Sequence, residues 1–185
     1  MKKTIYPILI VGIIFVVGLG ILYLPRVIME TKKKTVEYKK TDLSIAGFPL
    51  TVVDTIGRDI LIKEKPNQII SLAPSLTQTV FAIGVENRLV GRTRFCLWPP
   101  EAVAIKSIGG PAVPEIESMM ALKPDLILAT TLTPIEVVRQ IEALDVPIAI
   151  FKQEGVEGTF SDMQVIGRLT GTASQADAAI QKLEK

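Results

Sequence analysis

The chain has 185 residues, of which 48% are hydrophobic, enough for one domain with a substantial core. Its 21 basic residues exceed its 19 acidic residues by two, and Lys2 and Lys3 account for this difference, so the rest of the chain is neutral. A neutral body argues against nucleic-acid binding, which requires a basic face. The chain has no histidine and one cysteine, so the usual general base, the usual zinc or haem ligand and an intrachain disulfide are excluded.

An uncharged run of 20 residues, Ile5 to Leu24, lies near the N-terminus. Its length suits a helix that crosses a bilayer, about 20 residues. Tyr6 and Tyr23 lie near its ends, where aromatic side chains favour the membrane interface. The alternative is a cleaved secretory signal with Gly18-Leu19-Gly20 as its cleavage site. Because the run is long and the cleavage site poor, we predict a retained anchor at residues 1–24. The charged, aperiodic residues 25–44 are predicted to form a linker.

Two short apolar segments, Thr51 to Val53 and Ile60 to Ile62, flank Thr55-Ile56-Gly57-Arg58 and predict a β-hairpin. Short strands then alternate with helices, which predicts an α/β fold with a doubly wound, mostly parallel sheet and flanking helices. The expected strands are Gln68–Leu72, Leu89–Gly91, Ser107–Ile108, Leu126–Ala129 and Ile148–Ile150. The expected helices are Leu76–Ile83, Pro114–Leu122, Pro134–Leu144, Phe160–Leu169 and Ala173–Leu183.

The first strand-to-helix turn contains Pro74, which cannot donate a hydrogen bond to a strand ladder. Ser75 followed by Gln78 predicts a capping box, and Gly84 marks the end of the helix. Such turns bring small polar groups and helix N-termini to the carboxyl edge of a sheet, where α/β proteins bind ligands. Pro74 and Ser75 are therefore candidate ligand-binding residues. A second capping box, Thr172 with Gln175, is predicted to start the last helix.

Five pieces of sequence carry a family resemblance. They are the predicted hairpin, the strand and turn from Ile69 to Thr77, the motif Phe95-Cys96-Leu97-Trp98-Pro99-Pro100-Glu101-Ala102, the pair Gly109-Gly110 with Glu117, and Leu122-Lys123-Pro124-Asp125. In this order they resemble the cobalamin and iron-complex binding proteins of ABC importers, over residues 47–185. The resemblance implies a non-enzymatic binding protein with two lobes joined by a long helix.

The same resemblance predicts the domain organisation. Residues 45–170 correspond to the first solute-binding lobe and residues 171–185 to the start of the joining helix. Family members continue into a second lobe, and nothing follows Lys185 here. We therefore expect the second lobe to be absent from this chain, and a separately encoded second lobe is a potential partner.

The aromatic motif corresponds to the loop that lines the ligand cleft of the family. Phe95, Cys96, Leu97 and Trp98 are accordingly candidate ligand-binding residues, because aromatic faces suit flat ligands. The alternative is that Phe95 and Trp98 only cover the edge of the sheet. For Cys96, metal ligation or nucleophilic chemistry is possible, but a small half-buried side chain is the favoured interpretation. In the turn Gly109-Gly110-Pro111, Gly110 and Pro111 are candidates for close approach to a ligand, unless this is an ordinary loop.

Glu117 is predicted to lie in the first turn of a helix, where the dipole favours a carboxylate. Ile116, Met119 and Met120 form the expected inward stripe, so Glu117 faces water. The resemblance implies that Glu117 pairs with arginines of the permease; the alternative is an ordinary solvated acid.

The resemblance also implies partners and a location: an ABC permease, the membrane, and a metal chelate such as cobalamin, haem or a ferric siderophore. No cofactor is implied. The C-terminal part is expected outside a single-pass anchor in the cell membrane, or in the periplasm or medium after signal cleavage. The positive-inside rule favours the opposite orientation, because these basic residues follow the apolar run: Arg26, Lys32, Lys33, Lys34, Lys39 and Lys40. We follow the resemblance.

Two other functional classes are open. One is a membrane-tethered interaction module that has lost solute binding. The other is a doubly wound enzyme, which the chain supports poorly, since it has no glycine-rich dinucleotide turn, no phosphate loop and no histidine.

Overall fold

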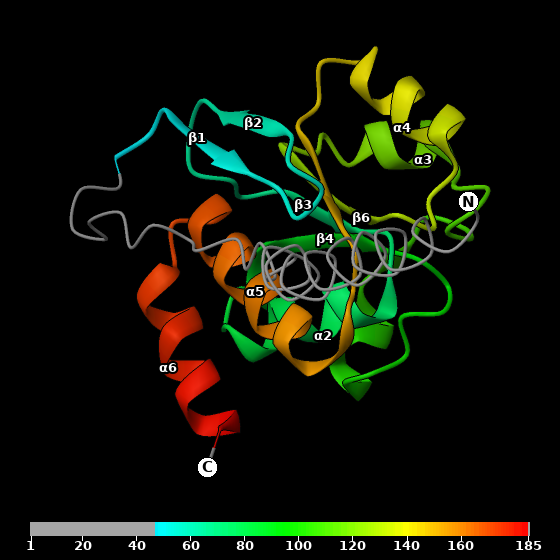
Figure 1. Cartoon of the computed structure of the whole chain (residues 1–185). Coiled ribbons are helices and arrows are strands. Elements are labelled where there is room, and N and C mark those ends of the chain that lie inside the picture. Colours follow the sequence, from blue (N-terminus) through cyan, green and yellow to red (C-terminus); the bar gives the residue numbers. More distant parts are fainter. Residues whose placement is uncertain (1–46, 185) are drawn as a thin grey trace, which may run out of the picture. The chain divides into compact units, whose positions relative to one another are not determined.

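The structure is a computed structural model that describes residues 47–184 (Figure 1). The predicted anchor and linker lie outside these residues. Within them, no helix has both the length and the apolar character needed to cross a membrane. The strands are β1 (Leu50–Val53), β2 (Asp59–Ile62), β3 (Ile69–Ser71), β4 (Leu89–Arg92), β5 (Lys106–Ser107), β6 (Leu126–Thr130) and β7 (Ile148–Phe151). The helices are α2 (Pro74–Ala82), α3 (Ile116–Ala121), α4 (Ile135–Glu142), α5 (Gly155–Leu169) and α6 (Ala173–Leu183), with short 3-10 turns at Glu86–Arg88 and Pro100–Ala104.

The strands form two sheets, which confirms the predicted fold class. β1 and β2 pair antiparallel as the expected hairpin. The other five strands form a parallel sheet in the order β5-β4-β3-β6-β7. Every residue of β3, β6 and β7 is buried, because helices or the hairpin cover both faces of the sheet. This explains why these strands are continuous apolar runs rather than alternating ones.

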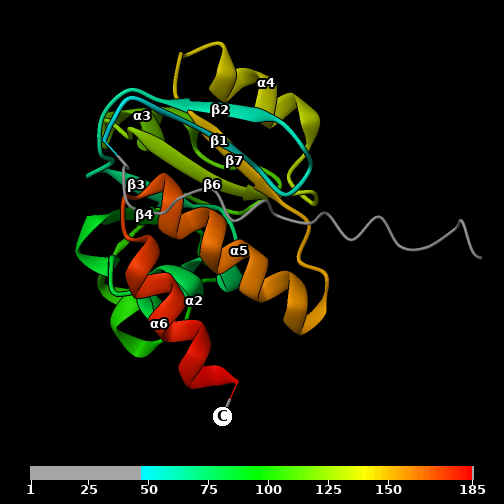
Figure 2. The same cartoon turned by 60° about the vertical axis from the view of Figure 1, so that its left-hand side comes forward.

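Alternation along each strand sends side chains into two separate cores. In β3, for example, Ile69 belongs to a core that includes residues of α2, α5, α6 and the hairpin, whereas Ile70 belongs to a core with residues of α3 and α4. The same division separates Leu128 of β6 from Ile127. Figures 1 and 2 show α3 and α4 on one side of the sheet and α2, α5 and α6 on the other. The result is a three-layer α/β/α lobe.

The turn of the hairpin covers the exposed edge of β7. The backbone N–H of Ile150 donates to the Asp54 carboxylate at 3.0 Å, and Arg58 donates to the carbonyl of Ile148 at 2.8 Å. The hydroxyl of Thr55 donates to the carbonyl of Ile150 at 3.2 Å and accepts from the N–H of Lys152 at 2.9 Å. An uncovered edge strand is a template for unwanted pairing. The hairpin therefore satisfies backbone groups on the edge of β7 that faces away from β6.

The predicted capping box at the start of α2 does not form. The helix begins two residues earlier than expected, with Ala73 as N-cap and Pro74 at the first helical position, and no side chain caps it. The fixed φ angle of proline suits that position, and its missing N–H costs nothing there. Ser75 therefore lies inside the helix, and its hydroxyl accepts a hydrogen bond from the side chain of Gln153 instead.

Two other helices, α3 and α5, do not start at the expected residue, and α6 starts as expected but without the expected side-chain cap. Thr172 is the N-cap of α6, as predicted, but its hydroxyl pairs with the hydroxyl of Thr170 at 2.7 Å rather than with the helix backbone. α3 starts at Ile116, because Pro114 forms a bridge with Gly109. α5 extends back to Gly155 through a glycine-containing stretch whose weak periodicity gave no helical signal.

Candidate functional site

Parallel pairing brings the carboxyl ends of the five strands to one edge of the sheet, and most of the predicted site residues lie there. Pro74 and Ser75 follow β3, Phe95 to Trp98 follow β4, and Gly110 and Pro111 follow β5. These three strands are neighbours in the sheet. The structure thus brings together three loops that are separate in the sequence, at the edge where doubly wound folds bind ligands.

The loop after β4 exposes its large apolar side chains. Phe95 is 53% exposed, Leu97 59% and Trp98 63%. Large apolar groups at the surface are informative when they gather at one place, because a contact with a ligand or partner offsets their hydration cost. The exposure argues against the alternative in which Phe95 and Trp98 merely cover the sheet edge.

Cys96 has a different position from its neighbours. It is fully buried, its N–H donates to the carbonyl of Thr93 at 3.0 Å, and its sulfur lies 3.2 Å from the hydroxyl of Thr93. This inward anchor turns Phe95 and Leu97 outward. The thiol cannot touch a ligand at the surface, so we remove Cys96 from the set of ligand-contacting residues and assign it to holding the loop.

A buried arginine, which the sequence analysis did not identify, holds the base of the same loop. The guanidinium of Arg92 donates to the carbonyls of Thr93, Ala102 and Val103 at 3.1, 3.1 and 2.8 Å. One cation therefore ties the end of β4 to the 3-10 turn that follows the double proline. The aromatic side chains stand on a rigid base, which lowers the entropy lost on binding.

The loops after β4 and β5 meet through Arg94. The backbone N–H of Arg94 donates to the carbonyl of Gly109 at 2.9 Å, and the central carbon of its guanidinium lies 5.1 Å from the ring centre of Phe95. A Cβ at Gly110 would lie 3.5 Å from the terminal nitrogen of Arg94, so the guanidinium covers this glycine. Gly110 is buried, and in this structure the group that approaches its backbone is Arg94. Pro111 beside it is half-buried.

Two further loops reach the same edge and were not singled out from the sequence. The turn after β6 projects Leu132, which is 85% exposed. Gln153, after β7, donates to the hydroxyl of Ser75 and so connects loops 78 residues apart. No local pattern signals such contacts, because they depend on strand order.

Glu117 lies in the first turn of α3 and is exposed, as predicted. Met119 of the same helix is fully buried, and Ile116 and Met120 pack against the same core. The predicted inward stripe is therefore confirmed. Among the described ion pairs none includes Glu117, so its carboxylate is open to a partner.

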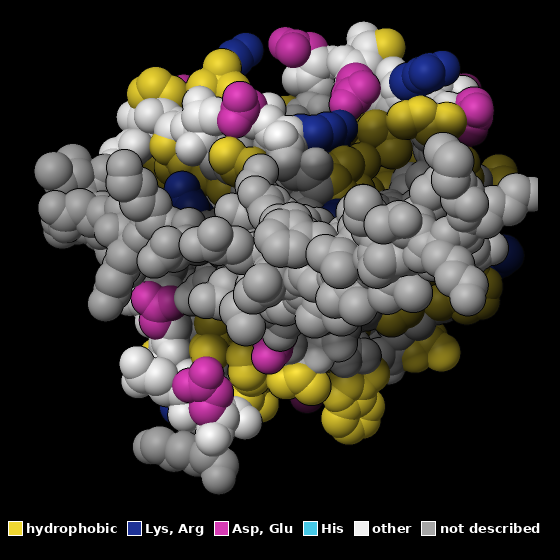
Figure 3. Space-filling view, in the orientation of Figure 1, with side chains coloured by type: hydrophobic (Ala, Val, Ile, Leu, Met, Phe, Trp, Pro, Cys, Tyr) yellow, Lys and Arg dark blue, Asp and Glu magenta, His cyan; other side chains and the backbone are white. Residues whose placement is uncertain are grey.

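Figure 3 shows one face of the molecule, on which basic, acidic and hydrophobic side chains are mixed in the upper part, around β2 and α4, and hydrophobic and acidic side chains lie along the lower part.

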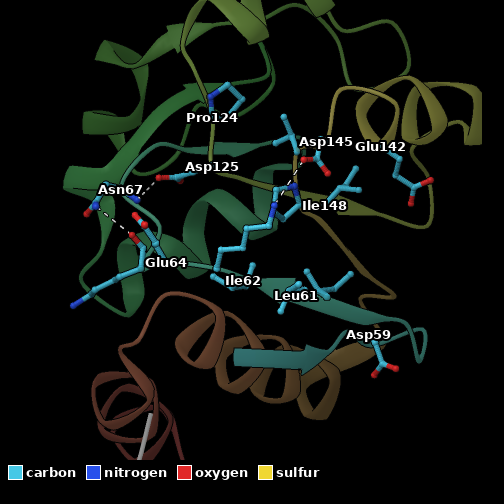
Figure 4. A pocket seen from close by; sticks show the side chains of 15 residues that line it. Asp59, Leu61, Ile62, Glu64, Asn67, Pro124, Asp125, Glu142, Asp145 and Ile148 are labelled. Carbon is cyan, nitrogen blue, oxygen red and sulfur yellow. Dashed lines mark hydrogen bonds and ion pairs between the residues drawn. The ribbon is translucent and has the colours of Figure 1, made fainter. Parts of the chain in front are cut away.

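A hollow of about 640 Å³ lies between β2 and the amino ends of β6 and β7 (Figure 4). Its polar groups serve the fold. The Asp125 carboxylate accepts from the N–H groups of Asn67 and Gln68 at 2.8 and 2.9 Å, and Glu142 pairs with Arg58 at 2.8 Å. Doubly wound proteins bind ligands at the opposite, carboxyl edge. We therefore do not take the hollow as the candidate site.

The described residues also offer no metal centre of their own, since no group of three or more cysteine or carboxylate side chains converges among residues 47–184. The edge instead carries three exposed apolar side chains, Phe95, Leu97 and Trp98, which we call the platform, and the exposed Arg94 lies beside them in the chain. Exposed aromatic and aliphatic side chains of this kind offer a large contact area to a ligand or partner.

The fold is similar to that of solved periplasmic binding proteins, and the chain covers less than half of each of the two described next. The lobe is similar to a periplasmic haem-binding protein from Pseudomonas aeruginosa, with a TM-score of 0.61 and 26% identity over 64% of this chain and 43% of that one. It is also similar in fold to a periplasmic solute-binding protein from Veillonella parvula, with a TM-score of 0.65 and 21% identity over 73% of this chain and 45% of that one.

Residues 69–185 match the family model described as periplasmic binding protein, and this chain belongs to that family. It is 26% identical over 141 residues to the ABC transporter substrate-binding lipoprotein YvrC of Bacillus subtilis, covering 74% of this chain and 45% of YvrC. It is 27% identical over 140 residues to a cobalamin-binding protein of Halobacterium salinarum, covering 74% of this chain and 38% of that protein. The resemblance found in the sequence is thereby confirmed. The chain spans less than half of the length of these two relatives, and both are described as binding proteins.

Proposed function

We propose that this chain provides the first lobe of an extracytoplasmic solute-binding component of an ABC importer, and that its solute is a metal chelate: cobalamin, haem or an iron siderophore. The observation that carries the proposal is the exposed group Phe95, Leu97 and Trp98 at the carboxyl edge of a parallel sheet. Flat chelates present large faces, and aromatic side chains cover such faces with little loss of conformational entropy.

The neighbouring candidates have roles that follow from their positions. Pro74 and Ser75 are exposed at the start of α2 and border the platform, as does Pro111. Gly110 lets Arg94 pack closely at the junction of two loops. Binding here is non-covalent, and no residue is assigned a catalytic role.

The location and the partners belong to the same proposal. Residues 1–24 anchor the protein in the membrane by a single pass, with the lobe on the outside; after signal cleavage the lobe is instead released. The lobe delivers its solute to an ABC permease, which Glu117 contacts. A second lobe, encoded with this one or separately, covers the other face of the solute.

Binding is tested by titrating the purified chain with cyanocobalamin, haemin and a ferric siderophore while recording tryptophan fluorescence. Trp98 is the only tryptophan of the chain, so the signal reports directly on the platform. We expect at least one chelate to quench it saturably. Trp98→Ala, assayed by calorimetry, is expected to weaken binding tenfold or more, because about 60–100 Å² of apolar contact is worth about 1.5–2.5 kcal/mol.

Leu61→Ala is the matched control, because Leu61 is similarly exposed on β2, away from the platform. The control is expected to bind normally. If no chelate binds, the lobe is an interaction module rather than a solute receptor. If a chelate binds Trp98→Ala as tightly as wild type, the platform is not the site.

A further inference from the structure

The β1–β2 hairpin has an edge that no strand of residues 47–184 covers. β1 and β2 form a two-stranded sheet of their own, so β2 has a strand neighbour on one side only. On its other side lies the hollow of about 640 Å³, which is lined by every residue of β2 and by none of β1 (Figure 4). The described part of the lobe therefore leaves this edge of β2 open.

The register of the hairpin decides which backbone groups the open edge presents. The N–H of Asp54 donates to the carbonyl of Arg58 at 2.9 Å, so these two residues form a hydrogen-bonded pair at the turn. Opposite pairs along an antiparallel ladder alternate between hydrogen-bonded and non-hydrogen-bonded. The two isoleucines of β2 therefore bond to β1, whereas the N–H and C=O groups of Asp59, Leu61 and Lys63 point away from it. Such a row of unpaired groups is a template for another strand.

The side chains at these three positions are complementary to themselves. Asp59 and Lys63 carry opposite charges at equal distance on either side of Leu61, and all three residues are exposed. When two antiparallel copies of β2 meet with a two-fold axis at Leu61, each Asp59 lies opposite a Lys63 and the two leucines lie opposite each other. An interface between identical surfaces requires this property. Opposite charges and apolar pairs directly across an antiparallel ladder stabilise it, and like charges destabilise it.

Both charges are available to a second copy. Asp59 belongs to none of the described ion pairs. Lys63 lies 3.8 Å from the carboxylate of Asp145, but these side chains are 76% and 96% exposed, and such pairs contribute little. A lysine on an edge strand normally prevents pairing with another chain. Here the acid at the symmetric position gives that lysine an opposite charge to meet.

We propose that this protein self-associates through β2, which pairs antiparallel with β2 of a second copy and joins the two hairpins into one four-stranded sheet. The contact lies beside the amino ends of β6 and β7, so it leaves the platform at the carboxyl edge open. A single strand pairing buries less area than the about 1,200–2,000 Å² of stable complexes, so we expect weak association, with a Kd of about 10–100 μM.

Charge reversal tests the pairing by sedimentation equilibrium of the full chain in a non-ionic detergent, from about 5 to about 500 μM. Asp59→Lys places two lysines opposite each other, and Lys63→Asp places two acids opposite each other. Each is expected to weaken association tenfold or more. The double variant Asp59→Lys/Lys63→Asp restores opposite charges in exchanged positions and should recover the wild-type Kd within about threefold. Glu157→Lys, which reverses an exposed acid of α5, is the control.

A disulfide locates the contact independently. The Cα atoms of a hydrogen-bonded antiparallel pair lie about 5.5 Å apart, which suits a disulfide. Leu61→Cys is therefore expected to give a cross-linked dimer under mild oxidation, seen on a non-reducing gel. Val53→Cys is the control, because Val53 is exposed on β1, and the β1 strands of the two copies are three spacings of about 4.8 Å apart. The native Cys96 is buried and should not cross-link.

Two results overturn the proposal. If the wild-type chain is monomeric over the whole concentration range, β2 does not pair with a second copy. If the chain associates but the double variant does not recover the affinity, or Val53→Cys cross-links as readily as Leu61→Cys, the copies meet at another surface. Melting temperatures of the charge variants at low protein concentration should match wild type, since exposed positions contribute little to folding.

Discussion

Asp162 lies in α5, and its side chain is buried: only 5% of the residue's surface is exposed. Burial disfavours the charged form and raises the pKa of Asp162 from 3.8 to about 7. Because the folded-state pKa exceeds the unfolded one, the folded chain holds a proton that the unfolded chain releases between these values. The contribution of Asp162 to the free energy of unfolding is therefore fully present below about pH 4 and is lost as the pH rises toward 7.

Asp162→Asn tests this at the residue scale. Asparagine mimics the protonated acid at every pH, so the advantage of the variant over wild type in free energy of unfolding is expected to grow by about 2–3 kcal/mol between pH 5 and pH 8. Urea denaturation at both pH values gives the difference. A variant that is less stable than wild type at pH 8 would show that the carboxylate is ionised and held by a partner.

Asp54 is a buried acidic side chain whose two oxygens both accept hydrogen bonds. It accepts hydrogen bonds from the N–H groups of Ile56, Arg58 and Ile150, and from the guanidinium of Arg58 at 3.0 Å. Asp54→Ala leaves these donors unpaired at the edge of β7 and is expected to cost about 3–5 kcal/mol in urea denaturation. Asp59→Ala, at an exposed position of the same hairpin, should stay within about 0.5 kcal/mol of wild type. Equal small losses for both variants would mean that the turn does not hold β7.

At the element scale, α5 and α6 pack closely because of one glycine. A Cβ at Gly167 would lie 2.6 Å from the Cβ of Ala176 and 3.3 Å from the backbone of α6. Alanine normally favours a helix over glycine, but here it forces the two helices apart. Gly167→Ala is therefore expected to lower the free energy of unfolding by about 1–3 kcal/mol.

Gly158→Ala is the matched control in the same helix. Its Cβ would meet only the side chain of Glu154 at 3.3 Å and a backbone atom at 3.8 Å. There the gain in helix propensity, up to about 1 kcal/mol, should offset the small adjustment. If Gly167→Ala is as stable as Gly158→Ala, the α5–α6 contact tolerates separation.

At the scale of the whole molecule, the proposed docking onto a permease needs a surface in addition to the solute platform. The exposed Glu117 on α3 is the residue we assign to it, and charge reversal should act on association rather than on folding. Glu117→Arg is expected to reduce co-purification with the permease at least tenfold while the melting temperature stays unchanged. Glu136→Arg, which reverses an exposed first-turn acid of α4, is the control. A large drop in melting temperature for Glu117→Arg would assign this residue to the fold instead.

The amino-acid sequence by itself determined the α/β class, the hairpin and the approximate position of each strand and helix. These features follow from local periodicity, because a strand or helix buries a face that its own residues define. The inward stripe of α3 was predictable for the same reason, whereas the loop Phe95–Trp98 was singled out by the family resemblance. The start of α2 was predicted wrongly. Ser75 favours a capping box and Pro74 favours the first helical position, and local rules do not say which of these two starts is preferred.

Only the tertiary structure decided which loops share the carboxyl edge and what each polar group there contacts. Strand order places the Gln153 amide on Ser75 and the guanidinium of Arg94 over Gly110, and it brings Asp54 to β7 across 96 residues. It also buries Cys96 between two exposed neighbours. Such contacts join residues far apart in the chain, so their energies depend on packing that no local pattern records.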